Sequence, residues 1–233
     1  MTTLVLLHGA WHGEWCWEPF VAALEGTGVR GLAIDLPAEE PDAGAVRHAD
    51  VVASAAAGLD DDLVVVPHSL AGLYAPVAAA RIGARGIVNL AALTPAPGSS
   101  GRQQAQALPG IYTEPYRTAP MTRHDDGSTS VPPEVGRRLM YHDVDAATAA
   151  RAQVQLRRQH WLTWTEPCPL DEWPALAYAH VACEADRVLD VPGMQDGAAR
   201  TGAPLSWIPG GHIPMVSHPR EAVRAVLAAI AAW

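Results

Sequence analysis

The chain has 233 residues, and its 25 acidic and 16 basic side chains give a formal net charge of −9 at pH 7. All the basic residues are arginine, and the absence of lysine excludes Schiff-base, pyridoxal-phosphate and P-loop chemistry, each of which needs that amine. A hydrophobic share of 49% with 18% charged residues is typical of a folded globular chain, and the length fits one domain. An acidic chain without a basic cluster is not expected to bind nucleic acid or an anionic membrane surface.

The three cysteines, Cys16, Cys168 and Cys183, are scattered along the chain without a C-x-x-C pair. This pattern predicts neither a disulfide framework nor a structural zinc site, and we expect no metal and no cofactor. The longest apolar stretch, residues 225–233, is too short to cross a bilayer, and no basic leader precedes the first apolar run. We therefore expect a cytoplasmic protein that acts on a small molecule.

Short apolar runs alternate with helical stretches in the first 94 residues. The expected strands cover residues 4–8, 29–35, 63–66 and 86–93. The expected helices cover residues 19–24, 43–59 and 70–82. This rhythm predicts an α/β protein whose parallel strands are joined by right-handed crossovers. Pro76 falls inside the third helix, where we expect it to kink the helix or remove one backbone hydrogen bond.

The alternation stops after residue 94 and returns near residue 180. Residues 95–179 contain a Pro/Gly/Ser-rich stretch, a polar loop and a helical block over residues 133–164, with no β-alternation. Strands are then expected at residues 180–183 and 205–208, and a last helix begins at Pro219 and ends at Ala232. The sequence therefore predicts a core formed by residues 1–94 and 180–233, with a mostly helical cap of residues 95–179 inserted after the fourth strand.

Ser69 lies where the third strand gives way to a helix, in the sequence VVPHSLAG. A strained turn at such a junction exposes a nucleophilic hydroxyl at the carboxyl edge of a sheet. The usual G-x-S-x-G pattern has small residues two before and two after the serine, where this chain has Pro67 and Ala71. Ala71 is small and is followed by Gly72, whereas Pro67 departs from the pattern. The alternative is that Ser69 only caps the helix.

The segment HGAWHGEWCW, residues 8–17, follows the first strand. A glycine-bearing turn at a strand end can direct backbone N–H groups at the serine as an oxyanion hole. The alternative is a tight turn into the next helix, with its tryptophans filling the core. His8 is expected to brace this turn by hydrogen bonds, and His68 is expected to pack beside the nucleophile without facing its hydroxyl.

An acid and a histidine each follow a later strand. Asp186 comes just after the strand at residues 180–183, and His212 follows the last strand in a Gly-Gly turn. The order serine, acid, histidine is that of a hydrolase triad with Ser69 as nucleophile. Competing candidates for the acid lie nearby, at Glu184 and Asp190. Arg187 offers Asp186 an alternative role in a surface ion pair.

Together these segments resemble the α/β-hydrolase family over essentially the whole chain. Residues 8–17 are similar to the branch that contains plant methyl esterases, hydroxynitrile lyases and bacterial relatives. The resemblance implies an oxyanion hole made by the backbone N–H groups of Ala10 and Leu70, and it allows a homodimer. Lyases of this branch carry threonine in place of Gly9 and lysine in place of Ile213, so the resemblance favours an esterase.

We therefore predict a serine hydrolase that cleaves a small, mostly apolar carboxylic ester through an acyl-enzyme, with Ser69, His212 and Asp186 as its triad. Residues expected to line the substrate pocket are Trp11, Tyr112, Met140, Trp161, Trp164 and Ile213. For the cap aromatics the alternative is packing of the cap onto the sheet. Arg157 and Arg158 are expected on a solvated helix face, with contact to an anionic group as the alternative. The function alternatives are a non-hydrolytic lyase, lactonising or cyclising enzyme and a non-catalytic ligand-binding protein.

Overall fold

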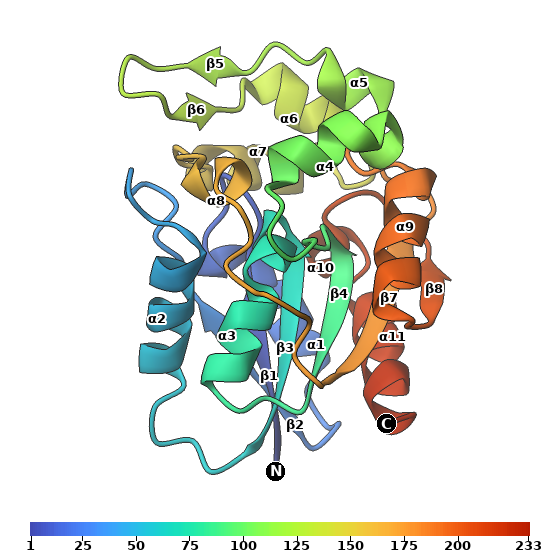
Figure 1. The fold of residues 1–233 in the computed structure, drawn as a ribbon. Coiled ribbons are helices and arrows are strands. Elements are labelled where there is room, and N and C mark those ends of the chain that lie inside the picture. Colours follow the sequence, from blue (N-terminus) through green and yellow to red (C-terminus); the bar gives the residue numbers. More distant parts are fainter.

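The computed structural model describes all of residues 1–233, and its centre is a six-stranded sheet (Figure 1). Every neighbouring pair of strands in it is parallel, in the order β2-β1-β3-β4-β7-β8. Its strands are β1 (Thr2–Leu7), β2 (Val29–Ile34), β3 (Asp62–Ser69), β4 (Gly86–Ala92), β7 (Ala177–Cys183) and β8 (Leu205–Ile208). The predicted α/β fold with a mainly parallel sheet is confirmed.

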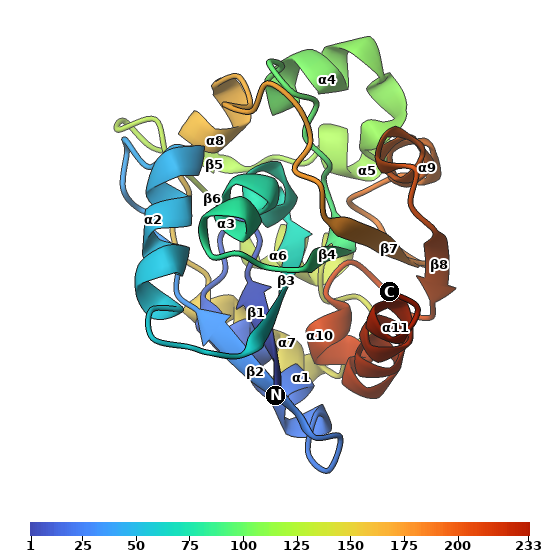
Figure 2. The same cartoon turned by 60° about the horizontal axis from the view of Figure 1, so that its bottom comes forward.

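Helices cover both faces of this sheet (Figure 2). On one face lie α2 (Ala45–Ala55), α3 (Ala75–Arg81) and α9 (Val191–Thr201), and on the other α1 (Glu18–Ala23) and α11 (Pro219–Ala231). In β1, Val5 and Leu7 belong to the core beneath α2 and α3, whereas Leu4 and Leu6 belong to the larger core on the opposite face. Burial on both faces explains why this strand is apolar at every position rather than at alternate ones.

The expected helix over residues 70–82 is two helices. A short 3-10 helix, η2 (Leu70–Leu73), ends at Leu73, and α3 begins after Tyr74, the one residue between the two helices. Pro76 therefore lies in the first turn of α3, where its missing N–H has no intrahelical partner to lose. The predicted kink inside a continuous helix is wrong for this reason.

The chain between β4 and β7 lies over the carboxyl ends of the strands (Figure 1). It contains α4 (Gly101–Ala107), η3 (Pro109–Ile111), α5 (Glu114–Arg117), β5 (Thr122–Arg123), β6 (Thr129–Ser130), α6 (Pro133–Leu139), α7 (Ala146–Gln155) and α8 (Leu162–Thr165). The antiparallel β5–β6 pair was not expected, because two-residue strands carry no alternation. The expected helical block is three separate helices, and residues 156–160 between α7 and α8 are not helical.

Two further elements, η1 (Glu14–Trp17) and α10 (Pro214–Ser217), follow the loops after β1 and β8. No helix combines the length and the hydropathy that a membrane span requires. All three cysteines are free and buried. Because the carboxyl ends of all six strands share one edge, the loops that follow them meet beneath the β4–β7 insertion.

Candidate active site

Ser69 lies at a strained turn between β3 and η2. Its backbone φ of 52° and ψ of −119° are rarely adopted by a residue with a side chain, and the register between β3 and β4 shifts at this residue. The turn is tight because Gly72 packs directly on the chain of Leu93. A Cβ at Gly72 would lie 1.8 Å from the Leu93 carbonyl oxygen. Such a turn presents the serine hydroxyl at the edge of the sheet.

Pro67 does not disturb this turn. It pairs in register with Leu7, the last residue of β1, and β3 continues through it to Ser69. The close approach to the neighbouring chain is made by Gly72, three residues after Ser69, rather than by the residue at position 71. The departure from G-x-S-x-G therefore leaves the strained elbow intact.

Ser69, His212 and Asp186 form a continuous hydrogen-bonded chain. His212 Nε2 lies 3.0 Å from Ser69 Oγ, and His212 Nδ1 lies 2.8 Å from Asp186 Oδ2. The side chains of His212 and Asp186 are 3% and 1% exposed. Asp186 Oδ1 accepts two backbone N–H groups, from Val188 at 2.7 Å and Leu189 at 3.0 Å. These two bonds fix the carboxylate so that its other oxygen faces the imidazole.

The competing candidates for the acid lie elsewhere. Asp190 caps α9, accepting a hydrogen bond from the Val191 N–H at 2.8 Å, and Glu184 is exposed. Arg187 does not pair with Asp186; its guanidinium donates to the carbonyl oxygen of Arg138 at 3.1 Å. Asp186 is thus the acidic residue that the structure brings to His212.

The loop after β1, residues 8–13, runs beside the serine; we call it the β1 loop. A Cβ at Gly9 would lie 2.8 Å from Ser69 Cβ, so only glycine fits at this approach. No protein group accepts the Ala10 N–H. Leu70 is the first residue of η2, and the first N–H groups of a helix have no acceptor within the helix. Ala10 and Leu70 line the same cavity as Ser69 and His212. The two predicted oxyanion donors are therefore brought to the serine.

Three buried histidines surround this centre, and hydrogen bonds to neighbouring backbone or side-chain groups hold each of them in place. His12 donates through Nδ1 to the Ala10 carbonyl at 2.7 Å and accepts through Nε2 from the Tyr141 hydroxyl at 2.6 Å, and burial lowers its pKa to about 3. His68 donates through Nε2 to the His212 carbonyl at 2.7 Å, and burial holds its pKa well below 6.5. His8 donates to the Gly9 carbonyl and accepts from the Leu36 N–H. None of the three bonds to the serine hydroxyl.

Two adjacent cavities lie between the sheet edge and the insertion. The inner one is lined by Ser69 and His212 and has a volume of about 20 Å³, room for about one water molecule. The outer one is a groove of about 760 Å³. Both are lined by the same aromatic residues, Trp11, Tyr112, Tyr116 and Trp161. These aromatics form the wall between the groove and the serine.

The other predicted pocket residues divide between these cavities and the core. Met140 lines the inner cavity and Trp164 lines the outer groove. Ile213 lines neither: it is 1% exposed and belongs to the main hydrophobic core, because it directly precedes α10 and packs inward there. Its assignment to the pocket is wrong.

Consecutive residues after α6 contact three of the loops that carry the site, and the sequence does not reveal this. Tyr141 bonds to His12 of the β1 loop, as described above. His142 Nε2 donates to the Ala185 carbonyl beside the acid at 3.1 Å. Asp143 Oδ2 accepts the Gly211 N–H beside the histidine at 2.6 Å. The insertion thus braces the site as well as covering it.

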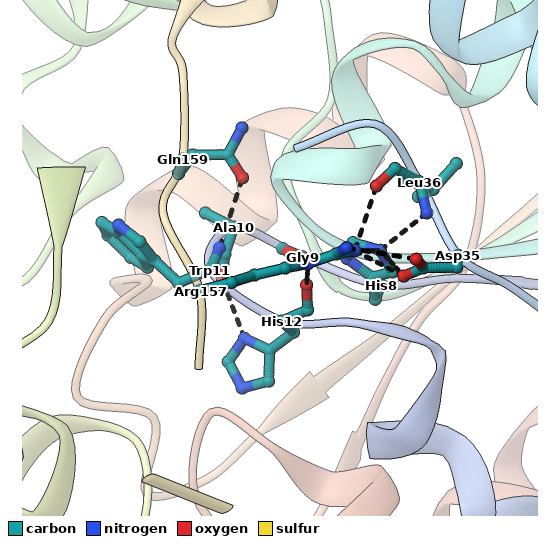
Figure 3. Close-up of polar contacts among 9 residues, drawn as sticks. All are labelled: His8, Gly9, Ala10, Trp11, His12, Asp35, Leu36, Arg157 and Gln159. Carbon is teal, nitrogen blue, oxygen red and sulfur yellow. Dashed lines mark hydrogen bonds and ion pairs between the residues drawn. The ribbon is translucent and has the colours of Figure 1, made fainter. Parts of the chain in front are cut away.

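Arg157 also differs from expectation. It lies after the end of α7 on extended chain, and its guanidinium pairs with Asp35 beneath the insertion rather than on a solvated helix face (Figure 3). Arg158 is exposed and pairs with Asp126 at 3.2 Å. No group of three or more histidine, cysteine or carboxylate side chains is arranged to hold a metal ion.

The chain is similar in sequence to the probable esterase PIR7A of Oryza sativa subsp. indica, at 39% identity over 107 residues, 40% of each chain. It is also similar to the carbendazim hydrolyzing esterase of Nocardioides sp. (strain SG-4G), at 34% identity over 111 residues. That match spans 43% of this chain and 46% of the relative, so both matches cover less than half of the relatives' own length. Among solved structures, polyneuridine aldehyde esterase shares the fold, with 18% identity and a TM-score of 0.82 over 98% of both chains.

The family model covers nearly the whole chain. The model described as "Alpha/beta hydrolase family" matches residues 4–226, which include every strand after the first two residues of β1 as well as the loops that carry Ser69, Asp186 and His212. The fold, with its parallel sheet and strained serine turn, agrees with that match. The chain therefore belongs to the alpha/beta hydrolase family.

Proposed function

We propose that this chain is a serine hydrolase that cleaves a compact, mostly apolar carboxylic ester through an acyl-enzyme. The observation that carries the proposal is the chain of two hydrogen bonds from Ser69 through His212 to the buried Asp186, at 3.0 and 2.8 Å. Sequence similarity to named esterases and membership of the hydrolase family support the same reaction class.

The reaction begins when His212 Nε2 accepts the proton of Ser69 as the hydroxyl oxygen attacks the ester carbonyl. Asp186 keeps the Nδ1–H tautomer of the imidazole and stabilises its protonated form. The Ala10 and Leu70 N–H groups bind the developing oxyanion, each contributing on the order of 3 kcal/mol to transition-state stabilisation. His212 then protonates the leaving alcohol, and a water molecule, deprotonated by the same imidazole, releases the acid.

The two cavities support a division of the substrate. The inner cavity has room for little more than the reacting carbonyl group of the ester, whereas the outer groove accommodates a larger apolar part. The shared aromatic wall favours flat or aromatic groups, since ring faces pack well against one another. We infer that the bulk of the ester lies in the outer groove, and that only its reacting end passes Trp11 and Trp161.

Two positions count against cyanohydrin cleavage. A threonine side chain at Gly9 would overlap Ser69 and His68, because even its Cβ would approach both residues to 2.8 Å. Ile213, at the position of the lyase lysine, is buried in the core and carries no charge for a cyanide leaving group. The site thus lacks both residues that mark the lyases of the similar branch.

The test combines active-site labelling with an ester panel. A fluorophosphonate probe should label the wild-type chain on Ser69, as located by peptide mass spectrometry, and Ser69→Ala should abolish both labelling and turnover of short-chain p-nitrophenyl and methyl esters. Ser54→Ala is the matched control, because Ser54 is exposed on α2. This control should label and turn over esters as the wild type does.

The remaining outcomes distinguish the alternatives. Retained ester hydrolysis in Ser69→Ala would refute the proposed mechanism. An inert Ser69 in the wild type would indicate a ligand-binding protein. Labelling of Ser69 without turnover of any ester would indicate a non-hydrolytic enzyme on the same scaffold.

A further inference from the structure

The segment between α7 and α8, residues 156–160, crosses the β1 loop; we call it the return segment. The Arg157 backbone N–H donates to the Trp11 carbonyl at 2.9 Å. The Gln159 side-chain oxygen accepts the Trp11 N–H at 3.2 Å (Figure 3). Both backbone polar groups of Trp11 are therefore bonded to the return segment, although about 145 residues separate the two in the sequence.

The Arg157 guanidinium lies between the β1 loop and the loop after β2 (Figure 3). Its Nε donates to the His12 carbonyl at 2.8 Å, and its Nη2 donates to the Leu36 carbonyl at 3.0 Å and lies 3.1 Å from His8 Nε2. Nη1 bonds to Asp35 Oδ2 at 3.1 Å, and Nη2 bonds to the other carboxylate oxygen. A planar guanidinium can satisfy these separate acceptors at once, whereas a lysine ammonium cannot.

Trp11 has a backbone φ of 63°, a left-handed conformation that is unusual for a bulky residue. Such a conformation persists only where its surroundings enforce it. Besides its two backbone bonds to the return segment, its indole N–H donates to Thr129 Oγ1 at 3.0 Å. Arg157 fixes the next carbonyl, that of His12. The residue directly before this restrained pair is Ala10, whose N–H we assign to the oxyanion hole.

We propose that Arg157 is a positioning residue for the reaction: it holds the β1 loop in the strained form that directs the Ala10 N–H at the oxyanion. This inference rests on the proposed function. If Arg157 has this role, the geometry of the oxyanion hole depends on the position of the return segment. It therefore depends on the insertion that covers the site, because the return segment belongs to that insertion. The neighbouring Arg158 provides the contrast, since its exposed guanidinium reaches only Asp126.

The test compares an inhibitor that forms an oxyanion with one that does not. With a trifluoromethyl ketone, the Ser69 oxygen bonds to the carbonyl carbon, the carbonyl π pair moves to the oxygen and the serine proton passes to His212. The corresponding methyl ketone binds without forming this adduct. The ratio of the two inhibition constants therefore reports on the oxyanion hole, whereas a change in fold or pocket shape affects both compounds.

We expect Arg157→Ala to lower kcat by about 10- to 100-fold with little change in KM, and to weaken the trifluoromethyl ketone by a similar factor while the methyl ketone changes less than about twofold. Arg157→Lys should keep the charge opposite Asp35 but lose the Nε and fork bonds, and should show at least about half of this effect on a logarithmic scale. Arg158→Ala should change every quantity by less than about twofold.

A lower melting temperature of Arg157→Ala with an unchanged ratio of inhibition constants would show a purely structural role and overturn the proposal. If Arg157→Ala does not fold, Asp35→Asn serves in its place, because Asp35 is exposed and lies outside the β1 loop. An unchanged ratio in Asp35→Asn would then overturn the proposal, whereas a rise of about threefold or more would support it. Failure of the proposed function is separate, since it would appear in the wild type as an unlabelled Ser69.

Discussion

Replacing Asp186 with asparagine exchanges one carboxylate oxygen for an NH₂ group. The surrounding hydrogen-bond donors determine how the new side chain is oriented. The Val188 and Leu189 N–H groups both point at Oδ1, so the amide oxygen is held there and the NH₂ group faces His212. The opposite orientation would break these two bonds and place the asparagine NH₂ group against the two backbone N–H groups, which costs about 2–4 kcal/mol. Each 1.4 kcal/mol corresponds to a factor of ten, so the first orientation is favoured by about 30- to 1,000-fold.

In that orientation His212 Nδ1 must accept a hydrogen bond, and its proton therefore moves to Nε2, the atom that faces Ser69. An imidazole in this tautomer cannot take the serine proton. The loss of the carboxylate charge further destabilises the imidazolium that the reaction requires. We therefore expect Asp186→Asn to lower kcat by about 10³- to 10⁴-fold near neutral pH with little change in KM.

The assay is the steady-state hydrolysis of a short p-nitrophenyl ester, accompanied by ¹⁵N NMR of the histidine rings, with His212 assigned by its own replacement. The matched control is Asp190→Asn, because Asp190 caps α9 and asparagine caps a helix about as well as aspartate. This control should retain kcat within about twofold. Retention of more than a tenth of the wild-type kcat by Asp186→Asn, or an unchanged Nδ1–H tautomer in it, would refute the reasoning.

Two further predictions follow from the packing and the titration of buried groups. Gly9→Ala places a Cβ 2.8 Å from Ser69 Cβ and should lower kcat by about 10- to 100-fold. The control is Gly110→Ala, whose added Cβ would lie 3.2 Å from Pro192 Cβ, and it should leave kcat unchanged. Equal kcat values for the two variants would contradict the close-approach argument. The free energy of unfolding should fall as the pH drops from 6.5 to 4, because burial lowers the histidine pKa values in the folded state and the unfolded chain then binds more protons. Burial lowers the pKa of His12 to about 3 and the pKa values of His48 and His180 to about 4. Urea titrations at pH 7 and pH 5 measure this, and equal stability at both values would contradict it.

The sheet and the catalytic candidates could be predicted from local sequence because each has a local cause. Apolar runs long enough for a strand end at glycine, proline or polar residues, and parallel strands place all their carboxyl ends at one edge. Ser69, Asp186 and His212 each follow such a strand, so their meeting at that edge depends on the fold class and little else. The strained turn at Ser69 likewise follows from a strand that leads directly into a helix.

The order in which short helices and strands fill the insertion was not predictable in the same way. The β5–β6 pair is too short to show a periodicity. The close approach of Gly72 to Leu93 joins two segments that are distant in the sequence, since Leu93 lies on the chain after β4. Ile213 directly follows His212 in the sequence, which says nothing about the direction of its side chain. Its side chain packs into the core because α10 begins immediately afterwards.

By itself, then, the sequence determined the α/β sheet and the chain order of serine, acid and histidine. The tertiary structure alone decided which side chains hold those loops in place. Arg157 reaches Asp35 and His12 across more than 120 residues, and Asp143 reaches Gly211 across 68. Such contacts leave no periodicity or spacing in the sequence, because an arginine or aspartate that bonds to a distant backbone looks the same locally as one that faces water.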